Sequence, residues 1–312
     1  MILPVHIQQK VNELFSGLNK EKLVSKREQL TTKYKTSQAV NKSVFESNED
    51  SAVYAISRMP STFAVIYTLI SDLMKQNKIE NIGSVIDIGS GTGAGYFACK
   101  ELFEDIEISL FERDKNMIDI FDRFETGESI KRFDFLKDSI ENSADLVMSN
   151  YVFSELNEEG RVTALKKMLV ASNKYVLIVD TGTPRTYENF MKLKKVVSEM
   201  GHKVIAPCLS EKCGLKNDYC QFYARVERSS LLKMSKSAEL SYEDEKYFYL
   251  LIAKNNECID INERRVIRRP QIKTNFVEIK LCTNAGVVDE KFTKKDKDSY
   301  KLARKIKINE IM

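Results

Sequence analysis

The sequence has only two histidines, no Cys-x-x-Cys pair, and no apolar run that approaches the length of a bilayer span. The missing apolar run argues against a membrane protein, so no membrane partner is expected. His6 and His202 are isolated, and we interpret them as structural or surface residues rather than metal ligands. The N-terminus lacks a basic stretch followed by an apolar core, so we expect no secretory signal. Glu13 and Glu21 also make it a poor transit peptide.

Charge is unevenly distributed along the chain. Residues 261–312 hold 14 Lys/Arg against 7 Asp/Glu, a local charge of +7, which leaves −3 for the rest of a chain whose total is +4. A basic tail on a mildly acidic body favours nucleic-acid contact, with a solvated lysine-rich surface as the alternative. Arginine binds phosphate through two parallel hydrogen bonds. The candidates for phosphate contact are Arg225, Arg228, Arg264, Arg265, Arg268 and Arg269, and for each a surface ion pair is the alternative.

Strand-like and helix-like segments alternate over residues 84–205. Residues 5–36 read as helix, 37–50 as a loop, and a further helical region is interrupted at Pro60. Four strands, each followed by a helix, are SVIDIG, EISLFER, ADLVMSNYVF and KYVLIVDTG. This alternation predicts an α/β fold with a doubly wound parallel sheet. Beyond 205, YFYLLIAKN and NFVEIKLCT are strands that either extend the sheet antiparallel or form a separate lobe.

Three regions follow from this pattern. We expect an N-terminal helical region over 1–80, a Rossmann-like cofactor domain over 81–205, and a cysteine-rich, basic C-terminal lobe over 206–312.

A glycine-rich turn, VIDIGSGTGAG, joins the first strand to the next helix. Glycines let the backbone approach a ligand closely, and a helix N-terminus favours polar or anionic groups. The dinucleotide fold uses a similar turn. Here an acidic residue two positions before the first glycine gives D-x-G-S-G-T-G, which resembles motif I of class I S-adenosylmethionine (SAM) methyltransferases. The candidate cofactor-binding residues of the turn are Asp87, Gly89, Ser90, Gly91 and Gly93; other nucleotides, or no ligand, are the alternatives.

Two strand ends add to this site. Glu112 closes the second strand, where a carboxylate can accept both ribose hydroxyls. Asn150 closes another strand at the same edge of the predicted sheet, where ligands of such sheets bind, although strand-end packing is the alternative. The sequence contains no Asn-Pro-Pro-Tyr motif and no cysteine at an obvious strand end for base C5 chemistry. No catalytic residue is therefore assigned.

Cysteines cluster after the alternating region. Cys208, Cys213 and Cys220 are separated by four and six residues, and without a signal peptide such thiols are better explained as metal ligands than as disulfides. Thiolates suit zinc or iron–sulfur. Zinc ribbons use Cys-x-x-Cys knuckles, so the wider spacing favours an iron–sulfur cluster, with zinc less expected. Either Cys258 or Cys282 qualifies by its distance as the fourth ligand.

From about residue 50 onward, the chain resembles the methyltransferase-like assembly factors of the small ribosomal subunit, which are known from mitochondria and have bacterial relatives. The resemblance rests on eight ordered segments: AVYAISRMPSTFA, VIDIGSGTGAG, DLVMSNYVFSEL, VDTGTPRTYENF, APCLSEKCGLKNDYCQFYARVERS, EDEKYFYLLIAK, RVIRRPQ and EIKLCTNAG. It implies a class I methyltransferase fold with a four-cysteine [4Fe-4S] site in which Cys282, and not Cys258, is the fourth ligand. The chain departs from the family pattern at Leu209 and Ser210 after Cys208, and at Tyr219.

The resemblance also implies a function. Our first hypothesis is a SAM-dependent methyltransferase that acts on small-subunit ribosomal RNA, with a cluster of structural role. The alternative is a non-catalytic SAM- and RNA-binding assembly factor, and a methyltransferase for a protein or small molecule is a third hypothesis. The expected partners are the small ribosomal subunit and its rRNA, and no DNA. We expect a cytoplasmic location in a bacterium, or the mitochondrial matrix if the chain is eukaryotic.

Overall fold

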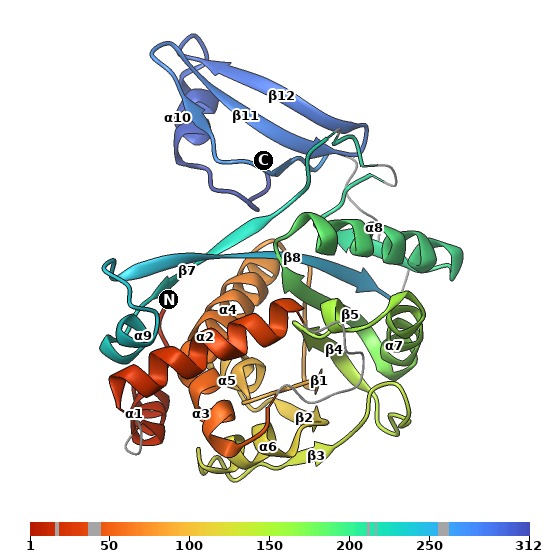
Figure 1. Cartoon of the computed structure of the whole chain (residues 1–312). Coiled ribbons are helices and arrows are strands. Elements are labelled where there is room, and N and C mark those ends of the chain that lie inside the picture. The colour runs from red at the N-terminus through yellow and green to blue at the C-terminus, as the bar shows by residue number, and fades with distance from the viewer. Residues whose placement is uncertain (16–18, 37–44, 211–212, 216, 255–261) are drawn as a thin grey trace.

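The structure is a computed structural model of the whole chain, and it describes all residues except 16–18, 37–44, 211–212, 216 and 255–261. Eight strands form the main sheet in the order β3-β2-β1-β4-β5-β8-β6, and β7 pairs with β8 (Figure 1). The strands are β1 Ser84–Ile88, β2 Glu107–Glu112, β3 Ile130–Arg132, β4 Ala144–Asn150, β5 Ser172–Thr181, β6 Lys203–Ala206, β7 Phe222–Glu227 and β8 Tyr242–Ala253.

Strands β1 to β5 are mutually parallel, as the alternating pattern predicts. The sequence reading missed β3, because three residues give too short a pattern. Strand β8 runs antiparallel between β5 and β6, so one of the two later strands extends the sheet. The main sheet therefore continues to Ala253, and the predicted division at residue 205 does not coincide with the end of this sheet.

Helices cover both faces of this sheet. Helix α4 (Met59–Lys75) packs on α5 (Ala94–Leu102), and α6 (Lys115–Asp122) contacts the same group of helices through α3 (Asn48–Ser57). Helices α7 (Glu158–Ala171) and α8 (Pro184–Glu199) pack on β4 to β6 and on β8. This placement on two faces is the doubly wound arrangement.

The N-terminal region is helical, with one break more than expected. The helix predicted over 5–36 is two helices, α1 (Val5–Leu14) and α2 (Lys20–Thr36). Helix α3 begins within the predicted loop, where the Ser47 hydroxyl accepts a hydrogen bond from the Asp50 amide. Pro60 lies in the first turn of α4, where proline costs no helical hydrogen bond, so the predicted interruption is a new helix start.

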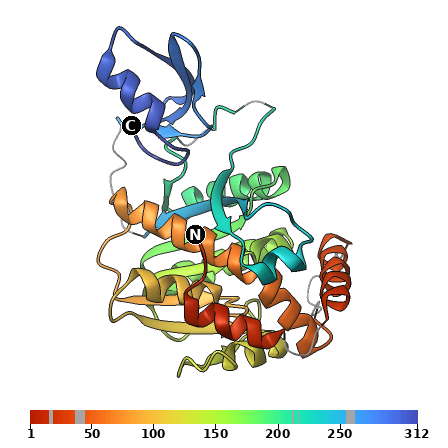
Figure 2. The ribbon, with the colours of Figure 1, turned by 90° about the vertical axis from the view of Figure 1, so that its left-hand side faces the viewer.

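The C-terminal lobe has its own small sheet and core. Its strands are β9 (Arg265–Val266), β10 (Gln271–Ile272), β11 (Phe276–Thr283) and β12 (Gly286–Thr293), ordered β10-β11-β12 with β9 on β11, and helix α10 (Lys297–Lys305) packs against β11 and β12. Helix α9 (Ser230–Ser235) belongs to the main body. The lobe stands beside one end of α4 (Figure 2), where the Gln76 amide bonds to the Asn309 carbonyl at 2.8 Å.

No single helix among the described residues has both the length and the apolar character of a membrane span. The bent pair α3–α4, with a 47° break, meets both criteria only when the two helices are taken together.

Candidate functional site

The glycine turn lies between β1 and α5 and borders a pocket at the carboxyl edge of the sheet. A Cβ atom on Gly95 would lie 2.4 Å from Asp87 Oδ2, so only glycine lets this carboxylate sit against the start of α5. Gly91 has a φ of +56°, and a Cβ there would meet no atom within 4 Å. The open side of Gly91 is therefore space that the described protein atoms leave free for a ligand.

Residues from three parts of the chain line this pocket. Five of the seven predicted cofactor residues do so: Asp87, Gly89, Ser90, Gly91 and Asn150. They are joined by Tyr54, Met59 and Thr62 from α3 and α4, by Thr92, Ala94 and Gly95 from the turn and α5, and by Tyr151 after β4. The sequence reading missed the residues of α3 and α4. The only signal for them was the segment AVYAISRMPSTFA.

The other two predicted cofactor residues lie outside the pocket lining. Gly93 caps α5 with a φ of +84°. The Glu112 carboxylate hydrogen-bonds to the backbone around it. It accepts from the Gly91 amide at 2.9 Å and from the amides of Arg113 and Asp114. Its contact with a ribose stays a prediction.

Buried polar atoms in the pocket lack partners among the described residues. Asn150 Nδ2 donates to Asp87 Oδ1 at 3.2 Å, but Asp87 Oδ2, Asn150 Oδ1 and the Tyr151 hydroxyl have no hydrogen-bond partner. The Asp87 and Asn150 side chains are 1% and 8% exposed. Burial raises the pKa of Asp87 to about 7, although the Asn150 amide lowers it. Because buried acceptors are rarely left unpaired, these atoms are suited to a hydrogen-bond donor on a ligand.

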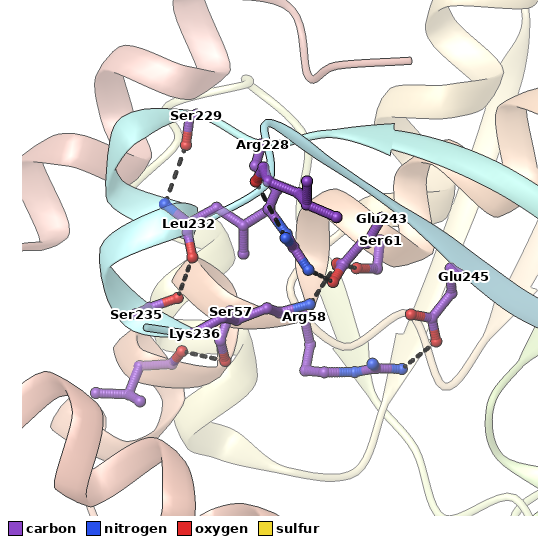
Figure 3. Close-up of polar contacts among 12 residues, drawn as sticks. Ser57, Arg58, Ser61, Arg228, Ser229, Leu232, Ser235, Lys236, Glu243 and Glu245 are labelled. Carbon is purple, nitrogen blue, oxygen red and sulfur yellow. Dashed lines mark hydrogen bonds and ion pairs between the residues drawn. The ribbon is translucent and has the colours of Figure 1, made fainter. Parts of the chain in front are cut away.

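A charged group stands next to the pocket at the junction of α3 and α4. The Arg58 guanidinium lies 5.8 Å from the ring centre of Tyr151, which has a left-handed backbone at φ +61° directly after β4. Arg58 Nη2 also donates to Glu245 Oε1 at 3.2 Å. Figure 3 shows the two side chains meeting, with Arg58 coming from the helix junction and Glu245 from β8.

The four predicted metal ligands lie in the region between α8 and the C-terminal lobe, without forming a group that could hold a metal ion among the described residues. Burial raises the pKa of Cys208 to about 12, and the nearby thiols of Cys282 and Cys213 raise it further. The pKa of Cys220 is raised first by burial and then by all three other thiols. These mutual effects place the four sulfur atoms in one neighbourhood. Cys258 lies outside the described residues.

The surroundings of these thiols are suited to negative charge. The Tyr187 hydroxyl, on α8, donates to Cys213 Sγ at 2.9 Å. Lys194 and Arg265 lower the pKa of Cys208, and Arg268 lowers that of Cys220. Within the described part of the chain, no group of three or more His, Cys, Asp or Glu side chains is placed to hold a metal ion.

Each of the six predicted phosphate-binding arginines has an acidic partner. The pairs are Arg225 and Arg269 with Asp244, Arg228 with Glu243, Arg264 with Glu290, Arg265 with Glu263, and Arg268 with Asp218. Arg265 is fully buried, so the prediction that it contacts phosphate is wrong. It instead donates from Nη1 to Gln76 Oε1 at 2.8 Å and to the Asn309 carbonyl at 2.9 Å, which joins the lobe to the end of α4. For the other five arginines, phosphate contact stays a prediction.

The strand order, with five parallel strands and an antiparallel strand inserted before the last, and the glycine turn at the carboxyl edge together define a class I methyltransferase fold. The chain belongs to the Rsm22 family, described as mitochondrial small ribosomal subunit Rsm22, whose family model matches residues 48–310. No curated protein matches the chain in sequence.

Among solved structures, the chain is similar to three methyltransferases. The first is the plantazolicin methyltransferase BpumL in complex with S-adenosylhomocysteine (SAH), at 14% identity and a TM-score of 0.46, with 79% of this chain and 98% of that chain covered. The magnesium protoporphyrin IX methyltransferase of Synechocystis PCC 6803 with bound SAM has 8% identity, coverages of 77% and 99%, and a TM-score of 0.42. A provisionally assigned RNA methyltransferase from Pyrococcus horikoshii has 16% identity, coverages of 73% and 97%, and a TM-score of 0.40.

Proposed function

We propose that this chain is a SAM-dependent methyltransferase-like protein that acts with the small ribosomal subunit on its rRNA. The observation that carries the proposal is the pocket beside the glycine turn, where Asp87 Oδ2 and Asn150 Oδ1 are buried acceptors with no donor in the described structure. The α-ammonium group of SAM supplies such donors, and the free space beside Gly91 suits a ligand that approaches the backbone. When bound, SAM supplies the methyl group. The membership of the Rsm22 family supports the ribosomal part of the proposal.

We further propose a [4Fe-4S] cluster on Cys208, Cys213, Cys220 and Cys282. Four thiols that influence one another, three nearby cations and the Tyr187 hydroxyl suit a thiolate-bound cluster. The cluster has a structural role, because four cysteines leave no open position, and it fastens β11 to the loop after β6. Zinc is the less favoured occupant.

RNA contact is best supported by one face of α10. Lys297, Lys301 and Lys305 are spaced four residues apart, so they lie on the same face of the helix, and all three are exposed. In the described part of the chain none of them has an ion pair, unlike the six arginines. Ala303 and Ile306 on the opposite side are buried against the lobe. Unpaired exposed cations are free to contact phosphate.

The test combines binding and transfer. Calorimetry with SAH, anisotropy with labelled small-subunit rRNA fragments, and transfer of tritium from methyl-labelled SAM to assembling subunits are measured on the same protein. The expected result is binding of both ligands and tritium in the RNA. Binding of both without transfer would select the non-catalytic assembly factor, and RNA binding that is absent or insensitive to salt would favour a protein or small-molecule substrate. Absence of SAH binding would overturn the cofactor assignment. We propose the bacterial cytoplasm as the location, or the mitochondrial matrix if the chain is eukaryotic.

A further inference from the structure

The pocket beside the glycine turn contains buried acceptors and has a cation next to it. Among the described residues, Asp87 Oδ2 and Asn150 Oδ1 are buried acceptors that lack a donor. Tyr151, which lines the same pocket, lies under the guanidinium of Arg58. Unpaired acceptors in the pocket and a cation beside it are complementary to a ligand that carries a positive donor group and a negative group close together.

Arg58 has N–H groups that make no hydrogen bond to a described side chain. Its only hydrogen bond from a side chain to another described residue is the one from Nη2 to Glu245 Oε1, and a guanidinium has five N–H groups. The side chain is 35% exposed, so it is neither sealed in the core nor free in solution. Met59, which follows Arg58 directly, and Thr62, four residues after Arg58, line the pocket from the first turn of α4. The amides of that first turn add positive potential.

A group of polar contacts around Glu243, which we call the brace, holds this arrangement in place. Glu243, two residues before Glu245 on β8, accepts hydrogen bonds from Arg228 at 2.7 Å and from the Ser61 hydroxyl at 3.0 Å, and it pairs with Lys236 (Figure 3). Two cations therefore already neutralise Glu243. Of these two carboxylates, Arg58 pairs only with Glu245. The brace joins α4 to β8 and fixes the helix junction from which Arg58 extends.

We propose that Arg58 binds the carboxylate of the amino-acid end of the cofactor, while Asp87 and Asn150 accept hydrogen bonds from its ammonium group. Glu245 is a positioning residue that orients the guanidinium. This inference rests on the proposed function, in which the pocket holds SAM. Arginine fits a carboxylate because two parallel N–H groups match its two oxygens. A phosphate group of the RNA fits less well, because Asp87 and Asn150 present only acceptor atoms to it.

The experiment compares two ligands that differ only in the carboxylate. Calorimetry measures the affinity of the wild-type chain and of Arg58→Ala for SAH and for decarboxylated SAH. We expect the substitution to weaken SAH binding about 10- to 100-fold, and to change binding of the decarboxylated ligand by no more than about twofold. Arg58→Lys, which keeps the charge without the bidentate geometry, should recover part of the loss. Arg228→Ala, which removes an arginine of the same brace, should affect both ligands equally.

The two ligands also separate recognition from folding. A misfolded Arg58→Ala protein loses both ligands together. In that case the Arg58→Lys variant is used instead, and its affinities for SAH and for decarboxylated SAH are compared in the same way. An equal loss for both ligands in Arg58→Lys, or no loss for SAH in a folded Arg58→Ala protein, would overturn the assignment of Arg58. A wild-type chain that binds neither ligand would instead overturn the proposed function.

Discussion

The glycine-turn pocket and the junction of the C-terminal lobe differ in how their buried acceptors are paired, while at the junction the buried atoms without a described partner are the donors Arg265 Nε and Asn309 Nδ2. In the pocket, buried acceptors on Asp87 and Asn150 have no donor among the described residues. At the junction, the buried guanidinium of Arg265 makes four hydrogen bonds, to Gln76, Asn309 and Glu263. A site that leaves acceptors without donors is prepared for a ligand, whereas a site that pairs them holds two parts of one protein together.

The same contrast separates the arginines from the lysines. The six predicted phosphate-binding arginines are engaged with carboxylates, while the lysines on one face of α10 are exposed and without ion pairs in the described structure. The contrast teaches that a count of basic residues in the tail overstates its binding surface. Burial and pairing decide which cations remain available to RNA.

The largest expected effect concerns the thiols at the junction. Cys282→Ser should abolish cluster binding, because it removes one of four ligands, and should lower the melting temperature by about 10 °C or more, because cluster binding contributes to folding. Iron and sulfide content of anaerobically purified protein, with a thermal melt, measures both. Cys258→Ser is the matched control and should keep the cluster. A full cluster in Cys282→Ser, or its loss in Cys258→Ser, would show that the fourth ligand is misassigned.

The second effect isolates the space that the pocket leaves open. Gly91→Ala should weaken SAH binding by about 100-fold, because the added methyl group occupies ligand space. The positive φ should also cost about 1–2 kcal/mol of folding free energy. Gly201→Ala is matched to it, since Gly201 has a φ of +77° and equally open surroundings outside the pocket. Calorimetry and urea unfolding measure the two effects, and similar SAH affinities in the two variants would contradict the assigned pocket.

The third effect tests the exposed face of α10. The triple variant Lys297→Gln, Lys301→Gln and Lys305→Gln should bind rRNA fragments about 10- to 100-fold more weakly and reduce the slope of log affinity against log salt by about 2. The control replaces Lys131, Lys166 and Lys203, which are exposed on the main domain, by glutamine. Anisotropy titrations over a series of KCl concentrations give both numbers. An equal loss in both triple variants would mean that RNA responds to overall charge rather than to α10.

The smallest effect is a pH dependence of cofactor affinity. Below its pKa of about 7, Asp87 is protonated and attracts an ammonium group less strongly. SAH affinity should therefore rise by about tenfold from pH 6 to pH 8, and Asp87→Asn should make the profile flat. In the absence of ligand, the folding stability depends on pH in the opposite direction to the SAH affinity. The raised pKa favours the folded state at low pH, and this contribution is lost as the pH rises from about 4 to about 7. A steep affinity profile in Asp87→Asn would assign the titration to another group.

The parts of the site that could be predicted are those whose geometry is local. The glycine turn follows its strand within a few residues, and Asn150 reaches the pocket because parallel strands end at the same edge of the sheet. The contribution of Tyr54, Met59 and Thr62 could not be predicted, because only the packing of α4 on the sheet brings them there. The same holds for Arg225, whose partner Asp244 lies opposite it where β7 pairs with β8.

Helix α4 connects the two regions compared above. Its first turn supplies Met59 and Thr62 to the pocket. Directly beyond its last turn, the Gln76 side chain accepts a hydrogen bond from Arg265 and donates one to the Asn309 carbonyl, both in the lobe. Seventeen residues make a stiff rod of about 25 Å. A tilt of about 5° at the lobe end displaces the other end by about 2 Å. A displacement of the C-terminal lobe that moves α4 therefore also moves Met59 and Thr62 in the pocket lining.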